Sequence, residues 1–169
     1  MPPSCAWLPA MRRYLVAIAA GNLAWETAQM PLYTLWRTGS WPDIAFAVVH
    51  CTGGDVLIAG ASLVGGLLLL GAAEWPRTGF VAVGGTAIVF GLAYTIYSEH
   101  LNTVRHAWTY SVLMPTLPWL GTGLGPLAQW VIVPGLSFAA VSAFDLPTMG
   151  GPKFPSVPDH SARQSRRSP

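Results

Sequence analysis

Charged residues are scarce in this sequence. Asp, Glu, Lys and Arg together make up 9% of the 169 residues, far below the roughly 25% that is usual in soluble globular domains. Hydrophobic residues account for 52% of the chain, and they stand in long runs rather than in the periodic patterns that build a soluble core. This composition predicts a single membrane domain.

Positive charge and cysteine are also scarce. The formal net charge is only +2, and the basic residues gather towards the chain ends rather than along one groove, so no nucleic-acid partner is expected. Cys5 and Cys51 are the only cysteines. The topology predicted below places them at different depths, and a disulfide between them is therefore not expected.

Four apolar stretches are long enough to predict transmembrane helices. They cover about residues 14–35, a part of 44–73, about 79–98 and about 124–144. A bilayer is crossed by about 20 apolar residues. The second stretch is longer than that, so we expect it to begin as an interfacial or oblique turn and to bend near Gly53. The predicted fold class is all-α, a polytopic bundle of four transmembrane helices.

The segments outside these spans give the domain organisation. The transmembrane domain is expected over residues 11–146, with an interfacial helical segment before the last span. Residues 1–10, with three prolines, are interpreted as a leader or a misassigned start. Residues 147–169 are rich in Pro, Ser and Arg and predict a disordered cytoplasmic tail.

The distribution of Lys and Arg predicts the orientation. With four spans, both termini lie on one side of the membrane. That side carries Arg12, Arg13, Arg77, Lys153, Arg163, Arg166 and Arg167, whereas the other side carries only Arg37 and Arg105. By the positive-inside rule the termini are cytoplasmic, and residues 99–120 face outwards.

Two polar stripes cross the apolar background. Asn22, Glu26, Gln29 and Tyr33 are spaced by four, three and four residues, so they share one face of the first helix. A charged Glu26 near the bilayer centre would be costly, so this carboxyl is expected to be protonated, paired or facing water. A neutral carboxyl that only bonds a neighbouring helix is the alternative.

The second stripe repeats the same spacing at Thr95, Glu99, Asn102 and His106, provided that the third helix continues beyond the membrane. Arg105 and the aromatic Tyr110 follow closely. The stripe is either the lid of a site or the solvated face of an interfacial helix.

Metal ligation is a further hypothesis. Asp55 lies one helical turn after Cys51, with His50 beside it, and these residue types bind divalent metals. No recognised ligand spacing supports the hypothesis, and a solvated His50 with a helix-starting Asp55 is the alternative. In the last span, Gln129 follows a glycine-rich approach that is poor support for nucleotide binding.

Most of these polar residues map between the midplane and the outer surface, which predicts a polar pocket in the outer half of the bundle. The candidate acid/base residues are Glu26, Glu99 and His106. The candidate ligand-binding residues are Asn22, Gln29, Arg105, Tyr110 and Gln129, and the candidate metal ligands are His50 and Asp55. The cytoplasmic halves of the last three spans are almost wholly apolar, which argues against a channel.

Four stretches of the sequence carry a resemblance: WETAQMPLY, HCTGGDVLIA, YTIYSEHLNTVRHAWTYSVLMP and GTGLGPLAQWVIVP. Across roughly residues 25–134 they resemble a group of small bacterial integral-membrane proteins with four spans. The resemblance implies a multi-pass protein of the bacterial inner membrane. No activity is attached to that group, so nothing about chemistry follows.

Three functional classes remain open from the sequence. The first is a protein that binds a small molecule or lipid, with acid/base chemistry performed by its carboxyl groups. The second is a metal-binding protein that uses the Glu, His and Asp side chains. The third is a non-catalytic subunit or assembly factor whose polar stripes hold helices together.

Overall fold

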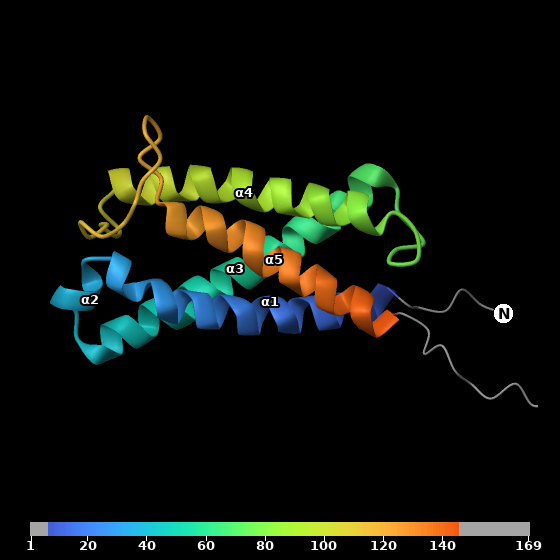
Figure 1. The fold of residues 1–169 in the computed structure, drawn as a ribbon, viewed down its shortest axis with the longest axis horizontal. Coiled ribbons are helices and arrows are strands. Elements are labelled where there is room, and N and C mark those ends of the chain that lie inside the picture. Colours follow the sequence, from blue (N-terminus) through green and yellow to red (C-terminus); the bar gives the residue numbers. More distant parts are fainter. Residues whose placement is uncertain (1–6, 146–169) are drawn as a thin grey trace, which may run out of the picture.

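The computed structural model describes residues 7–145 and shows a bundle of long helices with no β-strand in that range (Figure 1). The elements are α1 (Trp7–Gln29), the 3-10 helix η1 (Met30–Leu32), α2 (Leu35–Thr38), α3 (Trp41–Leu70), α4 (Phe80–Val104) and α5 (Leu124–Asp145). The four long helices alternate in direction along the chain. The first described residues of α1 and the last of α5 therefore lie at the same end of the bundle (Figure 1).

Within residues 7–145, three helices are long and apolar enough to cross a membrane: α3, α4 and residues 124–143 of α5. The chain is thus a helical protein with membrane character, as its composition predicts. The helix α1 is not among the three. Its sequence carries Arg12 and Arg13 and the first three residues of the polar stripe, Asn22, Glu26 and Gln29. The lengths and compositions of the helices thus support three of the four predicted spans.

The first helix is displaced towards the N-terminus relative to its predicted range. It begins at Trp7, so residues 7–10 of the predicted leader belong to α1, with Pro9 in its first turn, where a missing N–H is tolerated. It ends at Gln29 rather than near residue 35, because Pro31 cannot donate the next helical hydrogen bond and the chain tightens into η1. The predicted tail, residues 147–169, lies outside the described residues.

The second predicted span is one unbroken helix, so the expected bend near Gly53 is wrong. Ser40 and Asp43 form a capping box at its start, and Gly71 ends it in the left-handed conformation, with φ of 58°. The apolar surplus therefore lengthens α3 instead of forming an interfacial turn. Thirty residues give a helix of about 45 Å, which is longer than the roughly 30 Å hydrocarbon core.

The predicted interfacial helical segment before the last span is also wrong. Residues 105–123 form turns and bends, because Pro115, Pro118 and Gly121 interrupt any helix. Backbone hydrogen bonds attach this connection to the segment after α1: Thr34 N donates to Thr109 O at 3.0 Å, and Ser111 N donates to Leu32 O at 2.8 Å. The two connections therefore form one joined layer across that end of the bundle.

The apolar core fills the half of the bundle farther from this layer. Tyr14 of α1 stacks on Phe138 of α5 with ring centroids 4.5 Å apart, next to the buried Leu63 and Val83. Small residues allow the helices to come close, as at Gly91 of α4, where the ring of Trp130 occupies the space that a Cβ would need. The polar residues are concentrated in the other half.

Candidate functional site

A cavity of about 310 Å³ lies in the polar half of the bundle, beneath the joined layer. Its walls come from the end of α1 and the segment after it through the start of α2, the first two thirds of α3, the second half of α4, the start of α5 and Trp108 of the 105–123 connection. The residues lining it are Glu26, Gln29, Met30, Tyr33, Leu35, Ala47, His50, Cys51, Gly54, Asp55, Ile58, Tyr94, Thr95, Ser98, Glu99, Asn102, Trp108, Pro126, Gln129 and Trp130. A volume of this size is at the lower end of the range for small-molecule sites.

The side-chain amide of Gln129 joins three helices in the cavity wall. Its Nε2 lies 2.8 Å from Glu26 Oε1 on α1, 2.9 Å from Asp55 Oδ2 on α3 and 3.0 Å from Asn22 Oδ1 on α1. Gln129 is only 2% exposed. An amide nitrogen has two hydrogens, so these three acceptors share the donors of one group.

The carboxyl groups of Glu26 and Asp55 lie next to each other, because both accept from the same nitrogen of Gln129. A hydrogen bond between two carboxyl groups requires a proton on one of them. Gln29 supports the pair from the side, because its Nε2 donates to Glu26 Oε1 at 2.9 Å and to Gln129 Oε1 at 3.1 Å. Trp25 fixes Gln29 in turn, with its indole N–H 3.1 Å from Gln29 Oε1.

The third carboxyl, Glu99 on α4, is held from the 105–123 connection. The hydroxyl of Tyr110 donates to Glu99 Oε2 and accepts from the backbone N–H of Gly123 at 3.1 Å. Burial, together with the bond to Glu99, raises the pKa of Tyr110. Burial and the nearby charge of Glu99 likewise raise the pKa of Tyr33. Both phenols therefore keep their protons over the physiological range.

The ionisable side chains that line the cavity are mainly acidic. Three of its lining residues are carboxylic acids, and among the described residues that line it there is no lysine or arginine. Among these described lining residues, His50 is the one side chain that can carry a positive charge. Buried charges without a partner are strongly disfavoured, so this site holds protons on its carboxyl groups or meets a ligand that offers hydrogen-bond donors.

The structure brings together most of the residues that the sequence singles out. Glu26, Gln29, His50, Asp55, Glu99 and Gln129 line the cavity, Asn22 lies directly behind Gln129, and Tyr110 reaches Glu99 from outside the wall. Five members of the two polar stripes, namely Asn22, Glu26, Gln29, Thr95 and Glu99, are buried inside the bundle.

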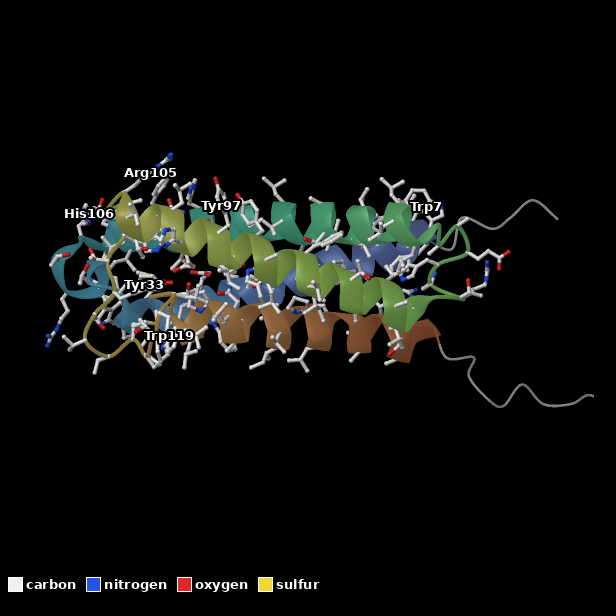
Figure 2. All side chains as sticks on the ribbon, turned by 90° about the horizontal axis from the view of Figure 1, so that it is seen from above. Trp7, Tyr33, Tyr97, Arg105, His106 and Trp119 are labelled. Carbon is white, nitrogen blue, oxygen red and sulfur yellow. The ribbon has the colours of Figure 1, made fainter. Side chains whose placement is uncertain are left out.

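Arg105 and His106 do not join the site. Both are exposed and point away from the cavity at the end of α4 (Figure 2). The reason is that α4 ends at Val104, and His106 follows with φ of 56°, so the helical spacing that would place it below Asn102 no longer applies. Among the described residues, His50 is the basic side chain that lines the cavity.

Sequence reasoning missed several lining residues. Ser98 and Tyr94 lie one and two turns before Asn102 on the same side of α4, and this spacing could have identified them. Trp108 and Trp130 were not recognisable, because their contribution depends on how the connection folds back and on how closely α5 approaches α4.

The metal hypothesis gains no geometric support. Among residues 7–145, no group of three or more His, Cys, Asp and Glu side chains is arranged to hold a metal ion. Glu26 and Asp55 both accept hydrogen bonds from Gln129 instead, while Glu99 is engaged by Tyr110.

Comparison with protein-family models, curated proteins and solved structures gives no match to this chain. The function therefore has to be argued from the site itself.

Proposed function

We propose that this chain is a four-span protein of the bacterial inner membrane that binds a small molecule or lipid in its cavity and exchanges a proton with it. The observation that carries the proposal is the convergence of Glu26, Asp55 and Glu99, from three different helices, on one cavity whose described lining residues include no lysine or arginine. Carboxyl groups at membrane depth are costly, and such groups usually mark a functional site.

The hydrogen-bond partners of the three carboxyl groups suggest two different roles, an acid and a base. Glu26 and Asp55 hold a proton between them and can donate it, with Gln129 fixing both acceptors. Glu99 accepts a hydrogen bond from the Tyr110 hydroxyl, which stabilises its anionic form, so it is the candidate base. An acid and a base facing one cavity suit isomerisation, hydration or hydrolysis of a largely apolar substrate.

The same proposal includes the fourth span and the orientation. The 23 residues of α1 give a length of about 35 Å, enough to cross the hydrocarbon core. Its polar stripe faces the cavity, and it packs between α3 and α5. Arg12, Arg13 and Arg77 lie at the end opposite the cavity, and the positive-inside rule makes that end cytoplasmic.

The decisive experiment compares the small molecules and lipids of cells that carry the wild-type chain, Glu99→Gln or Glu74→Gln. Glu74 stands in the connection between α3 and α4, far from the cavity, and provides the matched control. We expect one compound to accumulate and another to be depleted with Glu99→Gln, while Glu74→Gln resembles the wild type. Identical profiles for all three chains would contradict proton transfer and favour a subunit or assembly role.

A further inference from the structure

The exposure of the lining residues shows on which side the cavity opens. The lining residues of α1 and α5, including Glu26, Gln29 and Gln129, are buried. On α3 and α4 the lining includes exposed side chains, namely His50 and Tyr94, the latter 49% exposed. The opening therefore lies between α3 and α4.

The packing of these two helices explains the opening. Near the 71–79 connection they are in close contact: a Cβ on Gly65 would lie 3.2 Å from the ring of Phe90, and one on Gly66 would lie 3.3 Å from Val83 O. Towards the other end the two ribbons separate (Figure 1). At Gly54, which lines the cavity, a Cβ would have no heavy atom within 4 Å.

The depth of the opening places it within the bilayer. His50 and Gly54 lie nine and thirteen residues from the start of α3, which corresponds to about 14 and 20 Å along the axis. If the helix of about 45 Å is centred on a hydrocarbon core of about 30 Å, both positions fall inside that core. The neighbouring outer surface is apolar, with Phe46, Val49 and Leu57 all exposed.

We infer that the gap between α3 and α4 is a lateral portal through which a membrane-dissolved amphiphile enters, with its head group at Glu26, Asp55 and Glu99 and its apolar chain leaving past Gly54 and Tyr94 into the bilayer. This inference rests on the proposed function and specifies its ligand. The head group is a hydroxyl or an amine and carries no anionic group.

The lining of the cavity determines this choice of head group. Carboxyl groups and amide oxygens accept hydrogen bonds from a hydroxyl or ammonium group. A phosphate or carboxylate head would enter a site that has three carboxylic acids and no lysine or arginine among its described lining residues. Like charges at this distance in a low dielectric repel strongly. The aromatic side chains of Tyr94 and Trp108 suit the apolar part of the ligand or a cationic head.

The route is tested with two carbodiimides on protein in lipid nanodiscs. Dicyclohexylcarbodiimide dissolves in the bilayer and modifies protonated carboxyl groups, whereas a water-soluble carbodiimide reaches only aqueous ones. We expect the apolar reagent to modify the peptides containing Glu26, Asp55 or Glu99 in the wild type, and the water-soluble reagent to leave them unmodified. Equal modification by both reagents would overturn the lateral route.

Two glycine variants provide the matched comparison. Gly54→Leu places a side chain in the portal, while Gly53→Leu places the same side chain on the adjacent, open position that does not line the cavity. Both substitutions favour the helix, and neither meets a neighbouring atom at Cβ. We expect Gly54→Leu, but not Gly53→Leu, to prevent modification of the cavity carboxyl groups by dicyclohexylcarbodiimide. Unchanged modification with Gly54→Leu would contradict the portal.

The head-group class is tested with photoactivatable sixteen-carbon chains that end in a hydroxyl, an amine or a carboxylate. We expect the alcohol and the amine to cross-link to α3 and α4 about tenfold more than the carboxylate, and a Glu26→Gln/Glu99→Gln double variant to reduce capture of the amine.

The outcomes separate the two levels of the proposal. Capture that depends on Glu26 and Glu99 but is unaffected by Gly54→Leu would disprove the portal and leave the cavity function intact. Capture of the carboxylate in preference to the alcohol and amine would overturn the head-group assignment. If none of the three photoactivatable probes cross-linked in the cavity, both the portal and the binding function of the cavity would be disproved.

Discussion

The side-chain nitrogen of Gln129 lies 2.8 Å from Oε1 of Glu26, although more than a hundred residues separate them in the sequence. Through the same nitrogen Gln129 also reaches Asp55 and Asn22. One amide thus ties α5 to α1 and α3 at the depth of the cavity. Its hydrogen bonds position the two carboxyl groups that we assign to the acid.

Removing that amide should destabilise the bundle. Single interhelical hydrogen bonds in membrane proteins average about 0.6 kcal/mol. Gln129→Leu removes the three contacts of Nε2 and the one that Oε1 accepts from Gln29, so it should cost about 2 kcal/mol. Ser142→Ala, which removes only an exposed bond to the backbone of the same helix, should cost less than about 0.5 kcal/mol. Reversible unfolding in mixed micelles measures both. An equal, small effect of the two variants would show that the Gln129 contacts contribute little.

The close approach of α4 and α5 leads to a second prediction. A Cβ at Gly91 would overlap the ring of Trp130, so Gly91→Ala should force the helices apart and cost about 1–3 kcal/mol. Gly85→Ala on the same helix has open space at Cβ and should be neutral or slightly stabilising. Thermal unfolding of the two variants checks the prediction. A stable Gly91→Ala protein would mean that α4 and α5 are less tightly packed.

Alkaline pH should weaken the layer that closes the cavity. Because the pKa of Tyr110 and that of Tyr33 are raised in the folded state, the folded protein holds these protons more tightly than the unfolded chain. Their contribution to stability is complete below the unfolded pKa of about 10 and is lost as pH rises above it.

The measurement is the slope of stability against pH above about pH 10. Tyr110→Phe should be less stable at neutral pH, since the bonds to Glu99 and Gly123 are lost, and should show a shallower alkaline decline. Tyr97→Phe, at an exposed position, is the control and should follow the wild type. A Tyr110→Phe slope as steep as that of the wild type would show that Tyr110 does not keep its proton through burial.

Much of this arrangement could be predicted from the composition of the sequence and the spacing of its polar residues. The apolar runs located the helices, and the repeated four-three-four spacing placed Glu26 and Glu99 on inward faces. His106 was misassigned because the spacing was extended past the end of α4. That end depends on the connection folding back, with Tyr110 bonded to Glu99, and such a contact between a loop and a helix has no local signature in the sequence.

The course of α3 was misread for a related reason. The pair Gly53 and Gly54 predicts a bend when only local propensity is considered. In the bundle the helix stays unbroken, and the two glycines leave open space at their Cβ positions instead of changing the backbone direction. The role of Gly54 follows from the separation of α3 and α4, which sequence spacing does not report.

The orientation can be measured by cysteine labelling in a background without Cys5 and Cys51. Val112→Cys, at a position that is 99% exposed in the 105–123 connection, should react with a membrane-impermeant maleimide applied from outside. Thr78→Cys in the opposite connection should react only after permeabilisation. The reverse pattern would place the termini outside and the cavity on the cytoplasmic side.

The central claim is that the cavity holds a small molecule, and native mass spectrometry of the purified chain tests it most directly. Ser98→Trp places a large ring into the cavity, whereas His106→Trp places the same ring on the exposed end of α4. We predict one bound mass of defined size on the wild type and on His106→Trp, and its loss from Ser98→Trp. The same bound mass on Ser98→Trp, or none on any of the three proteins, would contradict the account.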